Sequence, residues 1–131
     1  MTAPDGRMRR LADCVAWMDD DLDEHVSQPY KDQPLAQDWA RVAKAVGEVG
    51  EAIEALGAYS GQNPRKGVHG SQDDLLTELS DSALTCIYAM QHFTKDAEAT
   101  IEILLSRAEY HVQRRKEQLG RTIEREDSHD T

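Results

Sequence analysis

Apolar residues recur along the first half of the chain at the three- and four-residue spacing of amphipathic helices. The first such run predicts a helix from about Pro4 to Glu24, with apolar positions Met8, Leu11, Val15, Met18 and Leu22. The segment from His25 to Pro34 is expected to be a connector. Pro34 suits the first turn of a second helix, which should end near Gly57 to Gly61. Its apolar positions are Trp39, Val42, Val46, Val49, Ile53 and Leu56.

The second half of the chain repeats this pattern after a loop. The segment Gly61 to Gly70 is rich in glycine and contains Pro64, which predicts a loop. Ser71, followed three residues later by Asp74, resembles a capping box that opens a third helix. The apolar positions of that helix are Leu76, Leu79, Ala83, Ile87 and Met90. After a break at Thr94 to Asp96, a fourth helix is expected, with apolar positions Ala97, Ile101, Leu104, Ala108 and Val112.

These four helices predict an all-α fold. Each apolar face has to be buried against another element, and with mostly short connections the expected architecture is a four-helix bundle. The chain has 131 residues, about the size of one domain. We expect a single helical domain over residues 1–120, ended by Gly120, and a polar, disordered tail over residues 121–131.

Charge and composition exclude several classes of partner. The formal net charge of −10 disfavours nucleic acid and anionic membranes as partners. No stretch is long and apolar enough for a transmembrane helix, and the N-terminus lacks the apolar run of a signal peptide. The expected location is therefore cytoplasmic. Cys14 and Cys86 fall within apolar helical patterns and are expected to be buried, reduced thiols.

Two pairs of acidic residues carry the candidate chemistry. Glu48 and Glu51 are three residues apart on the second helix, and Glu78 and Asp81 are three apart on the third, so each pair projects two carboxylates in one direction. If the pairs faced each other, a cation would be needed between them. Hard oxygen ligands select Mg²⁺, Ca²⁺ or Mn²⁺ rather than a soft metal. Mg²⁺, with Mn²⁺ as a possible substitute, suits a phosphoanhydride substrate, because it keeps several waters and binds phosphate oxygens.

A helical wheel gives the ordinary alternative. Both acidic pairs lie away from the apolar positions of their helices, as solvated polar faces do. Gly47 and Gly50 interrupt the second helix, which is unusual unless something approaches its backbone closely. The histidines do not have the Glu-x-x-His spacing of a di-iron bundle within the expected helices. These are His25, His69, His92, His111 and His129.

The two pairs together carry a resemblance to a known family. Glu-x-x-Glu, the 26 intervening residues 52–77, and Glu-x-x-Asp resemble the signature of the MazG-like all-α nucleoside triphosphate pyrophosphohydrolases. The local sequence is also similar to that of the family at Lys44, Val49-Gly50-Glu51 and Glu78-Leu-Ser-Asp81. The resemblance covers about Trp39 to Phe93.

The resemblance implies a Mg²⁺-dependent hydrolase that converts a nucleoside triphosphate, or a related nucleotide, to the monophosphate and pyrophosphate. It also implies that Glu48, Glu51, Glu78 and Asp81 are metal ligands, with Glu48 or Glu51 acting on the attacking water. A homodimer or homotetramer is implied as well, and we expect its second layer of helices to cover the acidic faces. Gly47 departs from the family, which commonly has a further glutamate there.

Two questions stay open at this level. The loop residues Arg65 and Lys66 are candidates for contacts to substrate phosphates, together with Lys44, but a solvated basic turn is an equal alternative. The competing function is a catalytically inactive, MazG-like helical protein with an interaction or regulatory role.

Overall fold

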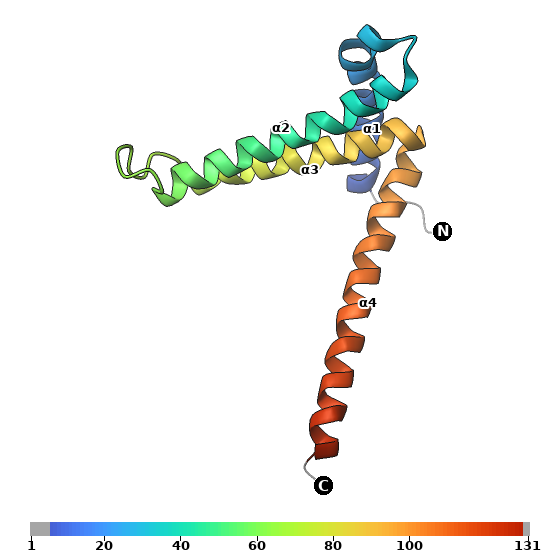
Figure 1. Cartoon of the computed structure of the whole chain (residues 1–131). Coiled ribbons are helices and arrows are strands. Elements are labelled where there is room, and N and C mark those ends of the chain that lie inside the picture. Colours follow the sequence, from blue (N-terminus) through green and yellow to red (C-terminus); the bar gives the residue numbers. More distant parts are fainter. Residues whose placement is uncertain (1–5, 130–131) are drawn as a thin grey trace. The chain divides into compact units, whose positions relative to one another are not determined.

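The described part of the chain is entirely helical. A computed structural model describes residues 6–129, with side chains described up to residue 121, and contains four α-helices and no strand within that range (Figure 1). The all-α prediction is therefore confirmed. The chain divides into two compact units, one ending at Ala97 and one beginning at Glu98, and each is described by itself. No helix among the described residues is long and apolar enough to cross a membrane.

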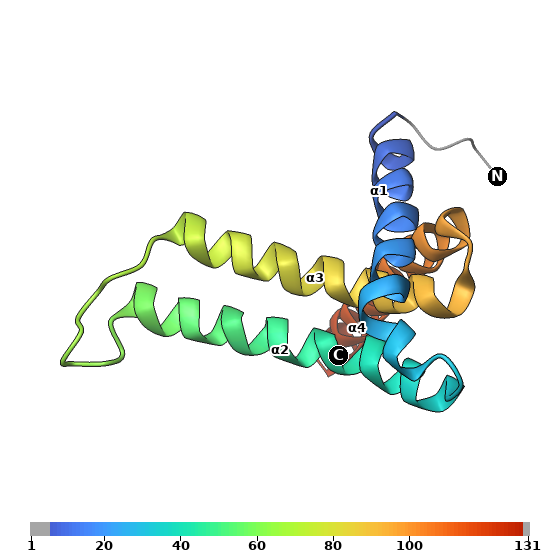
Figure 2. The ribbon, with the colours of Figure 1, turned by 90° about the horizontal axis from the view of Figure 1, so that it is seen from above.

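The N-terminal unit begins with α1, Gly6–Leu22, which runs directly into a π-helical turn, η1, Asp23–Ser27, and a 3₁₀ turn, η2, Gln28–Tyr30. The expected connector is thus largely helical rather than irregular. Pro4, the predicted start of the first helix, lies outside the described residues. α1 contacts α3 and η1 contacts α2, and α1 crosses the α2–α3 pair near one of its ends (Figure 2).

The centre of this unit is an antiparallel helical hairpin of α2, Pro34–Ser60, and α3, Gln72–Thr94 (Figures 1 and 2). Gly61 ends α2 in a left-handed conformation with φ 68°, which glycine adopts without strain. The predicted capping box starts α3: Asp74 N–H donates to Ser71 Oγ, and Ser71 N–H donates to Asp74 Oδ2, both at 3.1 Å. The boundaries predicted around Pro34, Gly61 and Ser71 are confirmed.

The packing of the hairpin reverses the expected burial. Small and polar side chains lie between the helices, and the buried residues of α2 and α3 are Arg41, Ala52, Ser82, Thr85, Ala89 and Gln91. The large apolar residues predicted to be the core of α2 are exposed; the side chains of Trp39 and Val46, for example, are 70% and 72% exposed. Small residues let two helices approach closely, so the polar faces of α2 and α3 meet and the apolar faces stay outside.

Two smaller expectations also fail. Cys14 and Cys86 are both exposed among the described residues, rather than buried as expected. A Cβ atom placed on Gly47 or Gly50 would meet nothing within 4 Å among the described residues, so no close approach there explains these glycines.

The second unit is the greater part of α4, Ala97–His129. The predicted end at Gly120 is wrong, since the helix continues through it; glycine lowers helix propensity but does not by itself end a helix. Helix therefore covers most of the predicted tail, and residues 130–131 lie outside the described range. Of the apolar positions predicted here, Ile101 is buried and Val112 is 54% exposed.

Candidate metal centre

The α2–α3 hairpin brings the two predicted acidic pairs together within one chain. Carboxylate oxygens of Glu48, Glu78 and Asp81 all lie within 4.8 Å of one another, and the charge of Glu51 acts on Glu78. The acidic sides of α2 and α3 therefore face each other within a single chain, while Glu51 and Asp81 stay exposed. The expected second layer of helices over the acidic faces stays a prediction. We call these four residues the carboxylate cluster.

Ser82 fixes the two helices at the level of the carboxylate cluster. Its hydroxyl oxygen lies 2.9 Å from the carbonyl oxygens of both Glu48 and Glu78, and its hydrogen can be donated to either. The side chain is buried, and a serine is small enough to let the α2 backbone come this close. Ser82 therefore sets the separation at which the carboxylates of the two helices meet.

Glu78 has the most unfavourable environment in the carboxylate cluster. Burial raises its pKa first, the neighbouring charges of Glu51, Asp81 and Glu48 raise it further, and a side-chain hydrogen bond with Glu51 adds to the rise. Its Oε2 atom is buried and has no hydrogen-bond partner among the described residues. A buried polar atom without a partner is costly, and native structures leave few of them.

The cluster has little compensating positive charge of its own. Lys44 Nζ lies 3.9 Å from Glu48 Oε1, and the lysine side chain is 41% exposed, so this ion pair is long and solvated. The residues fit a small divalent cation: Mg²⁺ binds oxygen at about 2.1 Å, which places opposite ligands roughly 4.2 Å apart. A cation at this position would also give Glu78 Oε2 the partner that it lacks.

Two cavities flank the carboxylate cluster. One, of about 280 Å³, is lined by Met18, Leu22, Lys44, Glu48, Asp81, Leu84, Thr85 and Tyr88. The other, of about 650 Å³, is lined by Glu51, Glu54, Ala55, Ala58, His69, Asp74, Thr77 and Glu78. The first combines apolar walls with one lysine and two carboxylates, whereas the second has four carboxylates and no lysine or arginine. A ligand with an apolar part and an anionic part therefore fits the first cavity better.

The basic residues predicted to contact phosphate are spread over different places. Lys44 lines the cavity beside Glu48 and Asp81. Lys66 lines a further cavity of about 530 Å³, which shares Glu54 and His69 with the acidic one. Arg65 lines none of these three cavities, and its backbone N–H donates to Asn63 Oδ1 at 3.1 Å. Lys44 is thus the one predicted phosphate contact that lies at the cluster.

A second group of potential ligands was missed by the sequence reasoning. Asp19, Asp23 and His92 also offer atoms within 4.8 Å of one another. Arg41, fully buried, donates to Asp19 Oδ1 at 2.8 Å and to Asp23 Oδ1 at 2.9 Å, and Lys95 Nζ donates to the other oxygens of both aspartates. We call these five residues the salt-bridge cluster.

Cations of the protein neutralise the two aspartates of the salt-bridge cluster. Burial would raise the pKa of Asp23, but Lys95 and Arg41 outweigh burial and hold that pKa below its usual value. Burial would likewise lower the pKa of Lys95, but Asp19 and Asp23 raise it. Two cations neutralise the two aspartates, so their charge does not call for a metal ion. His92 Nδ1 is nevertheless, like Glu78 Oε2, buried without a hydrogen-bond partner among the described residues, 3.7 Å from Asp23 Oδ1. The uncompensated charge, and not the unpartnered atom, therefore distinguishes the carboxylate cluster from this one.

Comparison with known proteins adds no relative. No family model, no curated protein and no solved structure matches the chain. Fold and site together define an all-α protein with a cluster of carboxylates between two antiparallel helices.

Proposed function

We propose that the protein is a Mg²⁺-dependent nucleotide pyrophosphohydrolase of the MazG-like kind, with Mn²⁺ as a possible substitute for Mg²⁺. The observation that carries the proposal is the gathering of the Glu48, Glu51, Glu78 and Asp81 carboxylates, of which Glu78 Oε2 is buried and unpartnered, with only a long ion pair of 3.9 Å from Lys44 to Glu48 to offset their charge. A cluster that stays negatively charged and unneutralised is suited to a divalent cation and to a substrate that arrives with the cation. The proposal includes a cytoplasmic location, where nucleotides are available.

The reaction is the hydrolysis of the α,β-phosphoanhydride of a (deoxy)nucleoside triphosphate or a related nucleotide. Water forms a new bond to phosphorus, the bridging P–O bond breaks, and the products are the monophosphate and pyrophosphate. Glu48, Glu78 and Asp81 would hold the metal ion, with Glu51 beside them. The bound cation supplies charge neutralisation for the phosphates and a lowered pKa for water.

The side chains of the protein itself have separate tasks. Glu48 or Glu51 orients the attacking water and accepts its proton. Lys44, which lies next to Glu48, offers a point charge to a phosphate. The apolar walls formed by Met18, Leu22 and Leu84 suit the nucleoside part of the substrate. Lys66 and Arg65 remain candidates for outer phosphate contacts only if the loop moves towards the carboxylate cluster.

The competing proposal is a helical interaction or regulatory protein that has lost catalysis. Gly47, which stands where the family commonly has a further glutamate, favours it. A side chain at Gly47 has open space around its Cβ, so Gly47→Glu should be accommodated without a clash. A wild-type protein without turnover, combined with turnover in Gly47→Glu, would support this alternative.

The experiment is a pyrophosphate-release assay with a panel of canonical, deoxy and modified nucleoside triphosphates and a phosphoribosyl-ATP-like compound, with Mg²⁺ or Mn²⁺. Turnover on at least one substrate is expected. Glu51→Gln and Asp81→Asn should lower kcat/KM by at least about 100-fold, because even residues that support metal ligands are worth 10- to 100-fold. Glu54→Gln is the matched control, one turn along the same helix face, and should change it only a few-fold.

Two outcomes would count against the proposal. If no substrate of the panel is hydrolysed, the proposal that the protein is an enzyme of this kind is contradicted. If turnover persists in both Glu51→Gln and Asp81→Asn, the active site is not the carboxylate cluster.

The proposal also includes a homodimer or homotetramer, as the resemblance implies. The finer architecture, a MazG-like four-helix bundle, belongs to the proposal as well. Within the N-terminal unit, the exposed apolar side of the hairpin is a surface on which such an assembly can form.

A further inference from the structure

The imidazole of His92, in the salt-bridge cluster, has one partnered and one unpartnered nitrogen. Its Nε2 lies 2.7 Å from Asp38 Oδ1, and because a carboxylate only accepts hydrogen bonds, Nε2 carries the hydrogen. In a neutral ring Nδ1 is then an acceptor. It is buried without a partner among the described residues, on a side chain that is only 10% exposed, and it lies 3.7 Å from Asp23 Oδ1. Two acceptors that face each other in a buried site are unfavourable unless a positively charged species lies between them.

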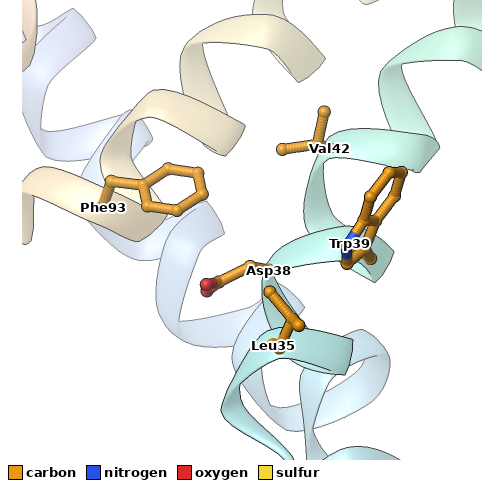
Figure 3. A pocket seen from close by; sticks show the side chains of 5 residues that line it. All are labelled: Leu35, Asp38, Trp39, Val42 and Phe93. Atoms are coloured by element: carbon orange, nitrogen blue, oxygen red, sulfur yellow. The ribbon is translucent and has the colours of Figure 1, made fainter.

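The hydrogen bond from His92 to Asp38 is the kind that supports a metal-binding histidine. Such a histidine almost always donates its second ring N–H to a carboxylate, a carbonyl or a water, which fixes the tautomer and the orientation of the ring. No lysine or arginine lines the cavity at Asp38, so none competes there with His92 for the carboxylate. This cavity has a volume of about 220 Å³ and is otherwise lined by apolar side chains, those of Leu35, Trp39, Val42 and Phe93 (Figure 3).

Asp19 and Asp23 offer oxygen ligands next to this imidazole. Together with His92 they offer one ligand atom each within 4.8 Å of one another. Zn²⁺ binds nitrogen and oxygen at about 2.0–2.2 Å, so the ligand atoms of a tetrahedral site lie roughly 3.4 Å apart. Arg41 already holds Oδ1 of both aspartates, at 2.8 and 2.9 Å. A small inward movement of the side chains would therefore complete a site.

Lys95 lies where a metal ion would bridge the two aspartates. Its Nζ is 2.9 Å from Asp19 Oδ2 and 3.0 Å from Asp23 Oδ2. Its side chain is 50% exposed, whereas that of Arg41 is 1% exposed, so Lys95 is the cation that can turn out into solvent. Arg41 then remains in the cluster with three carboxylates, those of Asp19, Asp23 and Asp38. The excess of two negative charges matches a divalent ion.

We propose that Asp19, Asp23 and Nδ1 of His92 form a second metal site, which binds Zn²⁺ when the ammonium of Lys95 gives way to it. One imidazole nitrogen with two carboxylate oxygens suits Zn²⁺ better than Mg²⁺, which is bound by oxygen. The ion joins α1, η1 and α3, to which the three ligands belong. None of them is part of the carboxylate cluster, so this zinc site stands or falls separately from the hydrolase proposal.

The direct test follows the imidazole nitrogens by NMR while Zn²⁺ is added to the full-length chain. The pH is about 7.5, where an unperturbed imidazole is largely neutral. Long-range ¹H–¹⁵N spectra distinguish a protonated, an unprotonated and a metal-bound ring nitrogen. The Nδ1 signal of His92 should shift until one Zn²⁺ per chain is bound there, and Mg²⁺ should leave it unchanged. His111, which is exposed on α4, is the internal control.

Calorimetry measures the affinity of the zinc site in an Asp81→Asn background, which weakens the carboxylate cluster as a competing site. His92→Gln removes a ligand and should weaken Zn²⁺ binding by at least about 100-fold. Asp38→Asn removes the partner of that ligand and should weaken it by about 10- to 100-fold. His111→Gln is the matched control and should leave the affinity unchanged.

Lys95→Gly distinguishes a metal site from a purely structural ion pair. Lys95 has a left-handed backbone with φ 53°, which glycine adopts without strain, so the variant keeps the end of α3 and removes the ammonium. It should bind Zn²⁺ about tenfold more tightly, because nothing then competes for the two Oδ2 atoms. A merely structural role of Lys95 predicts weaker binding instead. Lys95→Met is a second variant in case glycine loosens the helix end, as circular dichroism would show.

Three results would overturn the zinc site. One is a His92 Nδ1 signal that Zn²⁺ leaves unchanged; if that signal shows a bound proton, an imidazolium supplies the charge that faces Asp23. Another is a Zn²⁺ affinity that His92→Gln does not alter. The third is binding that neither Lys95→Gly nor Lys95→Met tightens. Pyrophosphate release by wild-type protein with Mg²⁺ in any of these cases would leave the hydrolase proposal standing.

Discussion

The two acidic clusters of the N-terminal unit have similar geometry and opposite electrostatics. Asp19, Asp23 and His92 offer ligand atoms within 4.8 Å of one another, and so do Glu48, Glu78 and Asp81. In the salt-bridge cluster, Arg41 and Lys95 reach both aspartates at 2.8–3.0 Å. In the carboxylate cluster, the lysine that comes closest to Glu48 stops at 3.9 Å. Proximity of acidic side chains therefore does not by itself define a metal site; the charge that is left over does.

The difference also separates two structural roles. The salt-bridge cluster joins α1, η1, α2 and the end of α3, because Arg41 additionally donates to the carbonyl of Tyr88. It holds the N-terminal helices against the hairpin. The carboxylate cluster joins only α2 and α3, and it opposes their approach unless a cation is bound. The stability of the protein should thus fall when a cation of the salt-bridge cluster is removed. It should rise when a metal ion binds to the carboxylate cluster.

The largest effect is expected for Arg41→Met, which keeps an apolar stem of similar length and removes the charge. Asp19 would be left buried without its main partner, and breaking a buried ion pair in this way costs about 3–5 kcal/mol. Urea unfolding followed by circular dichroism measures the change. Lys44→Met is the matched control on the same helix, and its cost should be below about 1 kcal/mol, since its ion pair is long and exposed. Equal losses in the two variants would show that the clusters do not differ as described.

The second effect is stabilisation by a divalent cation. A ligand present at 100 times its Kd stabilises the native state by about 2.7 kcal/mol. MgCl₂ titrated into metal-free protein should raise Tm in wild type, and the rise should be absent in Asp81→Asn. Asp38→Asn, which alters a carboxylate beside the salt-bridge cluster, should keep the full response. If the rise in Tm disappears in Asp38→Asn and persists in Asp81→Asn, the metal ion binds at the salt-bridge cluster and the assignment to the carboxylate cluster is contradicted.

Sequence patterns predicted the hairpin well because its limits depend on local chemistry. Pro34 at the first helical position, Gly61 in the left-handed conformation and the Ser71–Asp74 capping box act on their own helix ends and need no partner. The two acidic pairs were also predictable, since residues three apart share a helix side in any fold. The predicted end of the fourth helix at Gly120 was wrong because a glycine ends a helix only where the backbone leaves the helical conformation.

The burial of each face could not be predicted, because amphipathicity shows that a helix has two faces and not which of them finds a partner in the same chain. Ala52, Ser82 and Ala89 let the polar sides of α2 and α3 meet, and the apolar series that resembled a core remained outside. Arg41 shows the same limit. On a helical wheel it is a charged residue on the polar side of α2, and only the fold brings Asp19 and Lys95 to it.

The smallest effect is a difference in pH dependence, which follows from the opposite pKa shifts of Asp23 and Glu78. The pKa of Asp23 is lowered by folding, so its contribution to stability is present above the pKa of the unfolded chain and is lost as the pH falls through the lowered value. The pKa of Glu78 is raised by burial and by its acidic neighbours. In metal-free protein its relative stabilisation is therefore present below the ordinary glutamate pKa and is lost as the pH rises through the raised value.

The two variants Asp23→Asn and Glu78→Gln should accordingly change in stability over different pH ranges. Relative to wild type, Asp23→Asn should become less stable as the pH rises from the lowered pKa of Asp23 to the ordinary aspartate pKa of about 4, with little further change above it. Metal-free Glu78→Gln should become more stable than wild type as the pH rises from the ordinary glutamate pKa of about 4.3 through the raised pKa of Glu78. Thermal unfolding in the presence of a chelator measures both differences. Because the amide in Glu78→Gln cannot ionise, saturating Mg²⁺ should reverse its advantage by stabilising wild type alone. Parallel pH profiles for the two variants would mean that Glu78 is solvated like an ordinary surface glutamate, and the contrast between the clusters would then disappear.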